Sequence, residues 1–560
     1  MSAMIKKKYY PQHMHIHSIY EPGASMEGHM YFASLLGMKY IWFTEHDILW
    51  EKKSFSFGFE PNETEPDEHG IPTQVFLPTC DSIGDIKIDM FKPYEGASSM
   101  RLTAKENKSE IWQGAAAVSA GKNVCQSLCC TPTLSFAYRS DIHSDGDVRY
   151  IFDLCLSERP PDQRFAHILF VSGCSEGLEA PHTLIKPISV SKEWNRISFD
   201  IADIALSDEA CLASVGGLDN VMSSLTVRVE TRRGASASLY IDSLEVEGRT
   251  TAEETKSNQT KLAHEIGKKY GITPFVTAEI SAGGIHKNCF STDTPIFTYG
   301  DPFHKVTHEK ACELMTERGQ VFSLNHPFVH LNSADPMTVD YNAECDAVVE
   351  RLEADNAGGA SLIEVGFPFG RYAPYTAHTR LWDSLAMRGI ILTGHGATDS
   401  HMMTEGWFSG NNFANFVGVD SEHEPTELDF AVAMREGALY AANPLVIKGD
   451  FSFTADEMRE MGSISVLPKG SKSHLSFSLE ITNHNWKVAW IVNGERVRLD
   501  RTARTGYYGE YELTTSEKID FVRVELYDYF GTLLLMTNPI YFTTDIKNIK
   551  NSTKGRTVYK

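Results

Sequence analysis

The chain has 560 residues, which suggests roughly three to four domains, or fewer if one of them is a large barrel. Its formal net charge of −22 excludes a general electrostatic attraction to nucleic acid or to an anionic membrane surface. Because no apolar stretch approaches the ~20 residues that span a bilayer, we expect a soluble, cytoplasmic protein with no nucleic-acid or membrane partner.

The first segment, residues 1–53, is predicted to contain a strand, a helix and a second strand. His15 and His17 stand one residue apart near its start, and side chains alternate along a strand, so both imidazoles point to the same side. That geometry suits two ligands of one metal ion. Apolar residues recur at helical spacing in Met26–Leu36, and Tyr40–Phe43 has the composition of a short buried strand.

Residues 54–250 differ from the first segment in sequence pattern, with little helical periodicity and many turn-forming residues. Leu225, Val227 and Val229 alternate with polar neighbours, as strand residues with one buried face do. We therefore expect an all-β sandwich inserted into the surrounding domain. Its last strands, ending at Tyr240-Ile241-Asp242, resemble the jelly rolls of carbohydrate-binding modules.

Alternation of strands and helices resumes in residues 251–445. Repeated β–α units predict a parallel sheet or barrel whose ligands gather at the carboxyl ends of the strands. The predicted strands are Thr273–Ile280, Val321–Leu324, Leu362–Val365 and Ile390–Thr393. The predicted helices are Glu253–Tyr270, Thr376–Arg388, which Gly389 closes, and Thr426–Glu436, which Gly437 closes.

The last part of the chain is predicted to be a small β-sandwich, residues 446–545. Asn493-Gly494 is a hairpin signal between two strand-like runs. Residues 546–560 are rich in lysine and arginine and contain no acid after Asp545, so we expect a disordered basic tail.

Metal-ligand residue types follow several of the predicted strands at the point where each strand ends. Carboxyl ends of neighbouring strands meet at one edge of a sheet or one mouth of a barrel, so these groups are expected to converge. They are Glu45 and His46, Glu279, His326, and Asp399 with His401.

This ordered set of motifs resembles the PHP family, the polymerase and histidinol phosphatase superfamily, over about residues 10–52 and 251–445. Glu279-Ile280-Ser281 followed by His286-Lys287-Asn288, together with the stretch 394–401, is most similar to the branch that contains the carbaryl-hydrolase-type enzymes. The resemblance implies an α/β fold with a distorted (β/α)7 barrel, a TIM-like barrel that holds two or three divalent ions of zinc, manganese or iron.

The resemblance also implies the roles of individual residues. Glu279 is expected to bridge two ions, and His286 or His326 to protonate the leaving group. The metal ligands implied by the matched motifs are His15, His17, His46, Glu279, His286, His326, Asp399 and His401.

The sequence departs from the family pattern in three places. His13 stands where the family usually has Asp, Glu45 replaces the Asp before the third His, and Glu21-Pro22-Gly23 replaces Ser-Asp-Gly. Glu21 is therefore a further candidate ligand, and both a two-ion and a three-ion site are compatible with the chain.

These features predict a PHP-type metallohydrolase in which hydroxide bound to the ions cleaves an ester-type bond, either a phosphoester or a carboxyl or carbamate ester. The substrate is expected to be a small molecule, with carbohydrate-linked compounds included, and a homo-oligomer is compatible with the sequence. One alternative is an amidohydrolase-type enzyme, whose barrel also begins with paired histidines. The other is a carbohydrate-recognition protein in which metal only stabilises the barrel.

Overall fold

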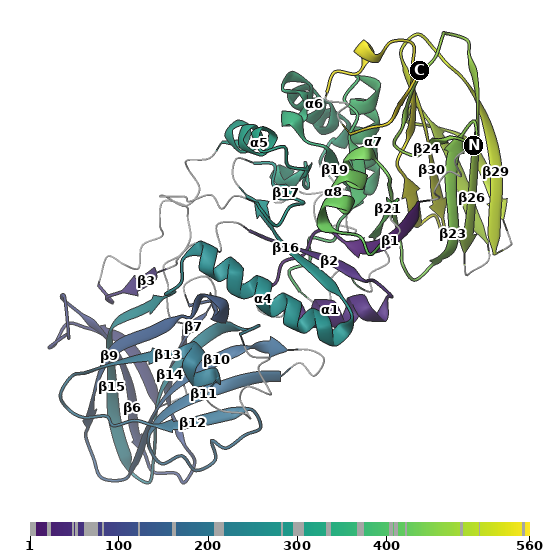
Figure 1. Cartoon of the computed structure of the whole chain (residues 1–560). Coiled ribbons are helices and arrows are strands. Elements are labelled where there is room, and N and C mark those ends of the chain that lie inside the picture. The colour runs from purple at the N-terminus through teal and green to yellow at the C-terminus, as the bar shows by residue number, and fades with distance from the viewer. Residues whose placement is uncertain are drawn as a thin grey trace. The chain divides into compact units, whose positions relative to one another are not determined.

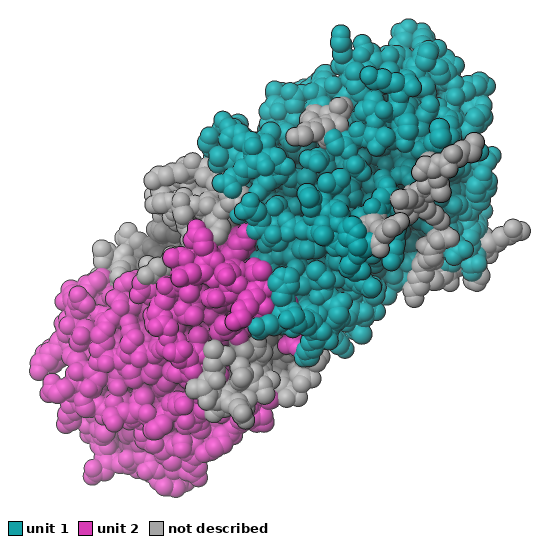
Figure 2. Space-filling model, in the orientation of Figure 1, with its two compact units in different colours: residues 1–17, 29–48, 264–560 teal, residues 18–28, 49–263 magenta. Residues whose placement is uncertain are grey.

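The computed structural model describes residues 7–19, 24–46, 50, 54–60, 77–80, 83–120, 124–159, 164–206, 218–281, 284–294, 307–331, 338–366, 374–402, 407, 413–420, 423–481, 485–502, 505–551 and 555–560. Contacts divide the chain into two compact units, coloured separately in Figure 2. Unit 1 comprises residues 1–17, 29–48 and 264–560, and unit 2 comprises residues 18–28 and 49–263.

Unit 2 is built mainly from two sheets, most of whose strands are labelled in Figure 1. One sheet contains β4 (Leu77–Cys80), β7 (Gln113–Ala120), β8 (Gln126–Ser127), β10 (Asp147–Arg159), β11 (Arg164–Gly173), β12 (Thr183–Pro187) and β14 (Val221–Arg232). The other contains β3 (Ser54–Phe57), β5 (Gly84–Asp89), β6 (Ser99–Asn107), β9 (Thr133–Ile142), β13 (Asn195–Asp200) and β15 (Ala235–Glu247). A short helix, α2 (Ile201–Leu206), follows β13.

Alternation along these strands explains the apolar core of unit 2. Leu225, Val227 and Val229 of β14 are buried, while the residues between them are partly exposed. Phe152 of β10 lies with its ring centroid 4.7 Å from that of Phe136 on β9, so the two sheets contribute to one core. The arrangement is that of a β-sandwich.

Unit 1 contains a long mixed sheet in the order β20-β19-β18-β17-β16-β2-β1-β21-β22, which continues through β31. Its strands are β1 (Lys8–His13), β2 (Tyr40–His46), β16 (Thr273–Ile280), β17 (Lys287–Cys289), β18 (Phe322–Leu324), β19 (Leu362–Gly366), β20 (Thr393–Gly396), β21 (Ala414–Val419), β22 (Leu439–Ala442) and β31 (Leu533–Thr537). The central strand β2 lies between β1 and β16 and is buried from Tyr40 to Glu45, as expected for a strand with neighbours on both edges and covered faces.

The prediction of a distorted (β/α)7 barrel is wrong. In such a barrel all strands are parallel and the sheet closes on itself. Here β17 is antiparallel to both β16 and β18, and β21 is antiparallel to both β1 and β22. Among the described strands the backbone pairing follows an open path. The expected TIM-like barrel is therefore wrong, and so is the PHP-domain phosphoesterase that was expected on its basis.

The helices outside the sandwich follow strands of the mixed sheet or precede them. They are α1 (Met26–Leu35), α4 (Ala252–Tyr270), α5 (His308–Glu317), α6 (Tyr341–Ala354), α7 (Tyr375–Met387) and α8 (Glu427–Glu436). At α8, Thr426 and Asp429 form a reciprocal capping box, and Gly437 ends the helix with φ +82°. The predicted bounds of α4, α7 and α8 are confirmed to within one residue.

The carboxyl-terminal strands of unit 1 form a smaller layered β structure. Its strands beside β31 are β23 (Ile447–Ala455), β24 (Arg459–Glu460), β25 (Ile464–Val466), β26 (Lys472–Ile481), β27 (Trp486–Val492), β28 (Glu495–Thr502), β29 (Gly506–Thr514), β30 (Ile519–Tyr527), β32 (Ile540–Thr543) and β33 (Val558–Tyr559). The hairpin predicted at Asn493-Gly494 is confirmed, because it joins the antiparallel pair β27 and β28.

Residues 546–560, expected as a disordered basic tail, are instead ordered where the structure describes them. β33 pairs with β25, and Arg556 is buried and donates to the carbonyl oxygen of Gly462 and to Thr393 Oγ1. The prediction from basic composition is therefore wrong, because one of these cations, Arg556, donates hydrogen bonds to backbone oxygen atoms in the interior. Within the described residues, no helix is long and apolar enough to cross a bilayer.

Candidate metal centre

Unit 1 brings together the candidate ligands from both ends of its sequence. His15 and His17 follow β1, His46 ends β2, Glu279 lies near the end of β16, and His286 directly precedes β17. The remaining candidates, His326 and the pair Asp399 and His401, follow β18 and β20. Glu21 lies outside the described residues.

A backbone bridge joins the first and last of these ligand segments. Ile16 pairs in parallel with Ser400, and the His17 N–H donates to the Ser400 carbonyl at 3.0 Å. Ile16 is fully buried on the opposite side of the segment from its histidine neighbours. The bridge thus places His15 and His17 beside Asp399.

Glu279 lies at the centre of the cluster, with imidazole nitrogens around both carboxylate oxygens. Oε1 also accepts a hydrogen bond of 2.8 Å from the Asn325 amide. The nitrogens closest to Oε1 are His326 Nε2 at 3.1 Å, His15 Nε2 at 3.3 Å and His286 Nδ1 at 3.3 Å, and those closest to Oε2 are His46 Nδ1 at 2.9 Å and His17 Nε2 at 3.5 Å.

Asp399 faces the same histidines from the other side. Its Oδ1 lies 3.1 Å from His17 Nε2 and 3.2 Å from His15 Nε2. Its backbone has φ +48°, a left-handed conformation that costs energy for a residue with a side chain. The backbone is thus held in a conformation that aims the carboxylate at the paired imidazoles.

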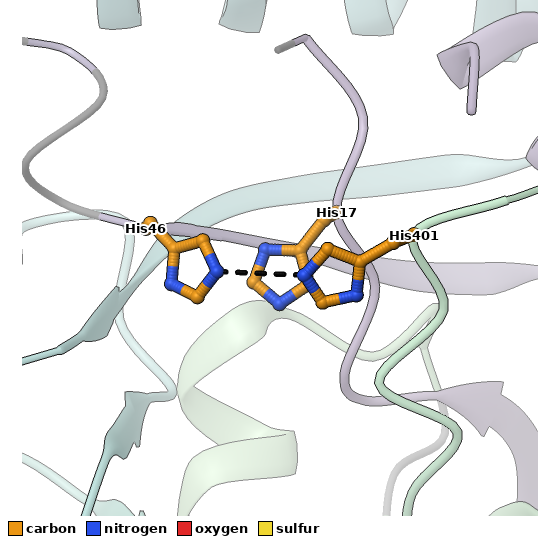
Figure 3. Close-up of side chains that lie close together, drawn as sticks. All are labelled: His17, His46 and His401. Carbon is orange, nitrogen blue, oxygen red and sulfur yellow. Dashed lines mark hydrogen bonds between the residues drawn. The ribbon is translucent and has the colours of Figure 1, made fainter. Parts of the chain in front are cut away.

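The imidazoles of His17, His46 and His401 lie close together in the cluster (Figure 3). His46 Nε2 and His401 Nε2 are 3.5 Å apart, and the His17 ring lies 4.2 Å from the His46 ring and 4.3 Å from the His401 ring. The side chains of His46 and His401 are 21% and 20% exposed, and that of His286 is 23% exposed, whereas His15 and Glu279 are fully buried. Solvent therefore reaches the cluster from the side of His46, His286 and His401.

Three overlapping groups within the described residues have ligand atoms close enough to hold a metal ion. In each group the ligand atoms lie within 4.8 Å of one another. The groups are His17, His46 and His401; His15, His17, Glu279 and Asp399; and His46, Glu279 and His286. His326 belongs to none of these groups, although it contacts Glu279.

The buried carboxylates are ionised because of their histidine neighbours. Burial alone would raise the pKa of Glu279, but His286 and His15 outweigh it and hold that pKa well below its ordinary value. Burial likewise opposes ionisation of Asp399, yet His15 and His17 keep its pKa well below the usual range. Two negative charges in the interior require positive charge beside them.

The pKa values of the His15 and His17 imidazoles are shifted in opposite directions. Burial lowers the pKa of His15, but Glu364 and Glu279 raise it well above its ordinary value. Burial and the neighbouring His46 hold the pKa of His17 well below its ordinary value. In the metal-free chain, a proton on His15 thus supplies the positive charge, and divalent ions at the same place would displace it.

The polar atoms of the cluster fit a metal centre. Glu279 Oε2, His286 Nδ1 and His17 Nδ1 are buried and make no hydrogen bond of acceptable geometry with the part of the chain that the structure describes. Unsatisfied polar atoms are costly in protein interiors, so three in one cluster of potential ligands are compatible with a bound cation. Mixed imidazole and carboxylate donors suit zinc, manganese or iron.

Two further histidines, His13 and His29, pack against Trp407 next to the segment that carries His15 and His17. His29 accepts a hydrogen bond of 2.9 Å from Trp407 Nε1 at its Nδ1, so its Nε2–H donates to the His17 carbonyl at 3.2 Å. His13 lies 3.1 Å from Thr398 Oγ1, and its ring centroid lies 4.9 Å from that of Trp407. Only their shared contact with Trp407 in the folded chain links these two histidines.

No family model matches the chain, and no curated protein matches it. Solved structures that are similar include a xylan-binding family 22 module from Paenibacillus barcinonensis, at 12% identity over 36% of this chain and 98% of that one, with a TM-score of 0.19. A family 11 carbohydrate-binding module from Clostridium thermocellum shares 11% identity over 34% of this chain and 94% of its own, with a TM-score of 0.21. A family 12 xyloglucanase from Bacillus licheniformis shares 10% identity over 35% of this chain and 98% of its own, with a TM-score of 0.24. These TM-scores are too low to assign a fold or a function.

Proposed function

We propose that unit 1 is a metal-dependent hydrolase that cleaves a carboxyl or carbamate ester of a small molecule. The observation that carries the proposal is Glu279, a fully buried carboxylate that two of the candidate metal groups share. A shared carboxylate keeps two cations close together. The similarity of the ligand motifs to the carbaryl-hydrolase-type branch stays a prediction, without the barrel that it implied.

The side chains have separate tasks in this proposal. Divalent ions held there would polarise the ester carbonyl and lower the pKa of a bound water molecule. The His15 and His17 imidazoles and the Asp399 carboxylate form the buried side of the site, so substrate approaches from the opposite side. His286 is the more exposed of the two candidate acids and His326 is buried, which favours His286 as the group that passes a proton to the leaving alcohol.

Elemental analysis and an ester screen test this proposal. We expect wild-type protein to contain zinc, manganese or iron and to hydrolyse chromogenic carboxyl or carbamate esters. Glu279→Gln and Asp399→Asn should lose metal and lower kcat/KM by at least about 100-fold, on the scale of removing groups that hold a metal. Glu353→Gln, which alters an exposed ion pair with Lys550 in the same unit, is the matched control and should retain both properties. A wild-type protein with a full complement of metal and no turnover of any ester would refute the hydrolase.

A second candidate is carbohydrate recognition by unit 2, favoured by an aromatic cluster on one sheet. The Arg139 guanidinium of β9 lies 3.6 Å from the ring centroid of Tyr240 on β15 and 5.3 Å from that of Trp194. Tyr94 packs edge-on against Trp194, and Phe91, whose backbone carbonyl accepts a hydrogen bond from Arg139, is 67% exposed. Aromatic rings with polar groups at their edges offer both stacking and hydrogen bonding to a sugar ring.

Calorimetry with a panel of oligosaccharides tests this second candidate. Trp194→Ala should weaken the affinity for any oligosaccharide that the wild-type protein binds. Trp112→Ala is a matched control in the same unit, because Trp112 also lies under arginine side chains but contacts Arg149 and Arg232. Equal losses in both variants, or no binding by wild-type protein, would count against carbohydrate recognition at this cluster.

A further inference from the structure

We propose that Glu364 is a positioning residue of the metal centre, a single carboxylate that holds the His15 ring and the His326 backbone in place. This inference rests on metal binding in the proposed function, and it adds a residue that belongs to none of the three candidate metal groups. Glu364 lies on β19 and is fully buried.

The first contact orients the imidazole of His15. Glu364 Oε1 lies 2.5 Å from His15 Nδ1, while Nε2 on the other side of the ring lies 3.2 Å from Asp399 Oδ1 and 3.3 Å from Glu279 Oε1. A carboxylate beside Nδ1 favours the ring form that carries hydrogen there. The lone pair of Nε2 is then free to face an ion between the two acids.

The second contact holds the segment after β18. The His326 N–H donates to Glu364 Oε2 at 2.6 Å. His326 has φ +28°, which a residue with a side chain adopts only when its surroundings impose it. The same segment carries Asn325, whose amide donates to Glu279. Glu364 therefore also supports the residue that orients the shared carboxylate.

Both oxygens of Glu364 accept hydrogen bonds, so a carboxylate is required and an amide cannot replace it. Glutamine has one oxygen and can accept from His15 or from the His326 N–H, but its NH2 group would meet the other donor. Glu364→Gln therefore preserves size and removes one of the two contacts. Loss of either contact displaces a side chain at the ions.

Titration of the metal-free full-length protein with Co²⁺, followed by visible absorption, tests the proposal. We expect Glu364→Gln to raise the Co²⁺ dissociation constant about 10- to 100-fold, the usual effect of removing a hydrogen-bond partner of a metal ligand. Glu353→Gln should bind as wild type does. In a His15→Ala background, Glu364→Gln should weaken binding much less than it does alone, since its main contact is already gone.

Unchanged Co²⁺ affinity in Glu364→Gln would overturn the proposal, and so would losses that simply multiply in the double variant. Near-UV circular dichroism checks folding. If Glu364→Gln does not fold, Glu364→Asp takes its place, because it keeps both oxygens but cannot reach both donors. Binding of Co²⁺ without ester hydrolysis would contradict the hydrolase while leaving this comparison valid, and failure of wild-type protein to bind Co²⁺ would remove both proposals.

Discussion

The two units differ in what they bury. In unit 2 the interior is a continuous apolar core, and the arginine–carboxylate pairs, such as Arg228 with Asp153, lie where solvent reaches one or both partners. In unit 1 the interior contains the ionised carboxylates Glu279 and Asp399 surrounded by imidazoles. An apolar core stabilises a fold unaided, whereas buried charges need a partner, so the interior of unit 2 contributes stability by itself, while the charged cluster of unit 1 has the character of a binding site beside its own apolar cores.

Removal of metal is expected to produce the largest difference in stability between the two units. An ion at a free concentration 1,000-fold above its dissociation constant adds about 4 kcal/mol to the stability of the state that binds it, so two ions add about twice that. We expect chelation to increase hydrogen exchange in peptides around His17, Glu279 and Asp399 and to leave β10 and β14 unchanged. Mass spectrometry of the full-length chain measures both regions together. Equal increases in both units would erase the distinction.

A core substitution should have the converse effect. Phe152 is fully buried, and its ring centroid lies 4.7 Å from that of Phe136 and 5.4 Å from that of Tyr138. Phe152→Ala should destabilise unit 2 by about 3–5 kcal/mol through lost burial and the cavity left behind. Denaturant unfolding measures this change, and the metal content of the folded protein should stay that of wild type. Loss of metal in this variant would show that the units are not independent.

The smallest effect concerns a titratable pair in unit 2. A hydrogen bond of 2.8 Å to Asp153 raises the pKa of His167. The resulting stabilisation is present below the unfolded-state pKa near 6.5 and is lost as the pH rises through the higher folded-state value. His167 is partly exposed, so we expect a decrease of only about 0.5 kcal/mol in the unfolding free energy between pH 6 and pH 8. His167→Gln should abolish that difference, and a pH dependence that persists in the variant would assign it to other groups.

Local sequence signals predicted the elements better than their pairing. The strand Thr273–Ile280 is confirmed at both ends, because an apolar run bounded by turn residues defines its own limits. The direction of neighbouring strands is set by long-range contacts, and the antiparallel strand β21 at Ala414–Val419 was not predicted at all. An alternation of strands and helices therefore suggested a barrel where the structure has an open, mixed sheet.

The candidate site was more accessible to sequence reasoning than the fold. Ligand residues that end strands could be recognised in the sequence, and eight of them lie in one cluster. Among the supporting residues, Glu364 could be recognised because it also lies near the end of a predicted strand, whereas His29 and Arg556 have no local signal that separates them from exposed residues of the same type. Their roles depend on Trp407 and on backbone oxygens distant in sequence.

The bridge between Ile16 and Ser400 sets an order of events during synthesis. The earliest histidines leave the ribosome long before the segment that completes their surroundings has been translated. A nascent polypeptide that stops short of His401 contains the early candidate ligands but cannot form the complete cluster. If the cluster binds ions as proposed, their capture would follow translation of this last segment, after the sandwich of unit 2 has already emerged.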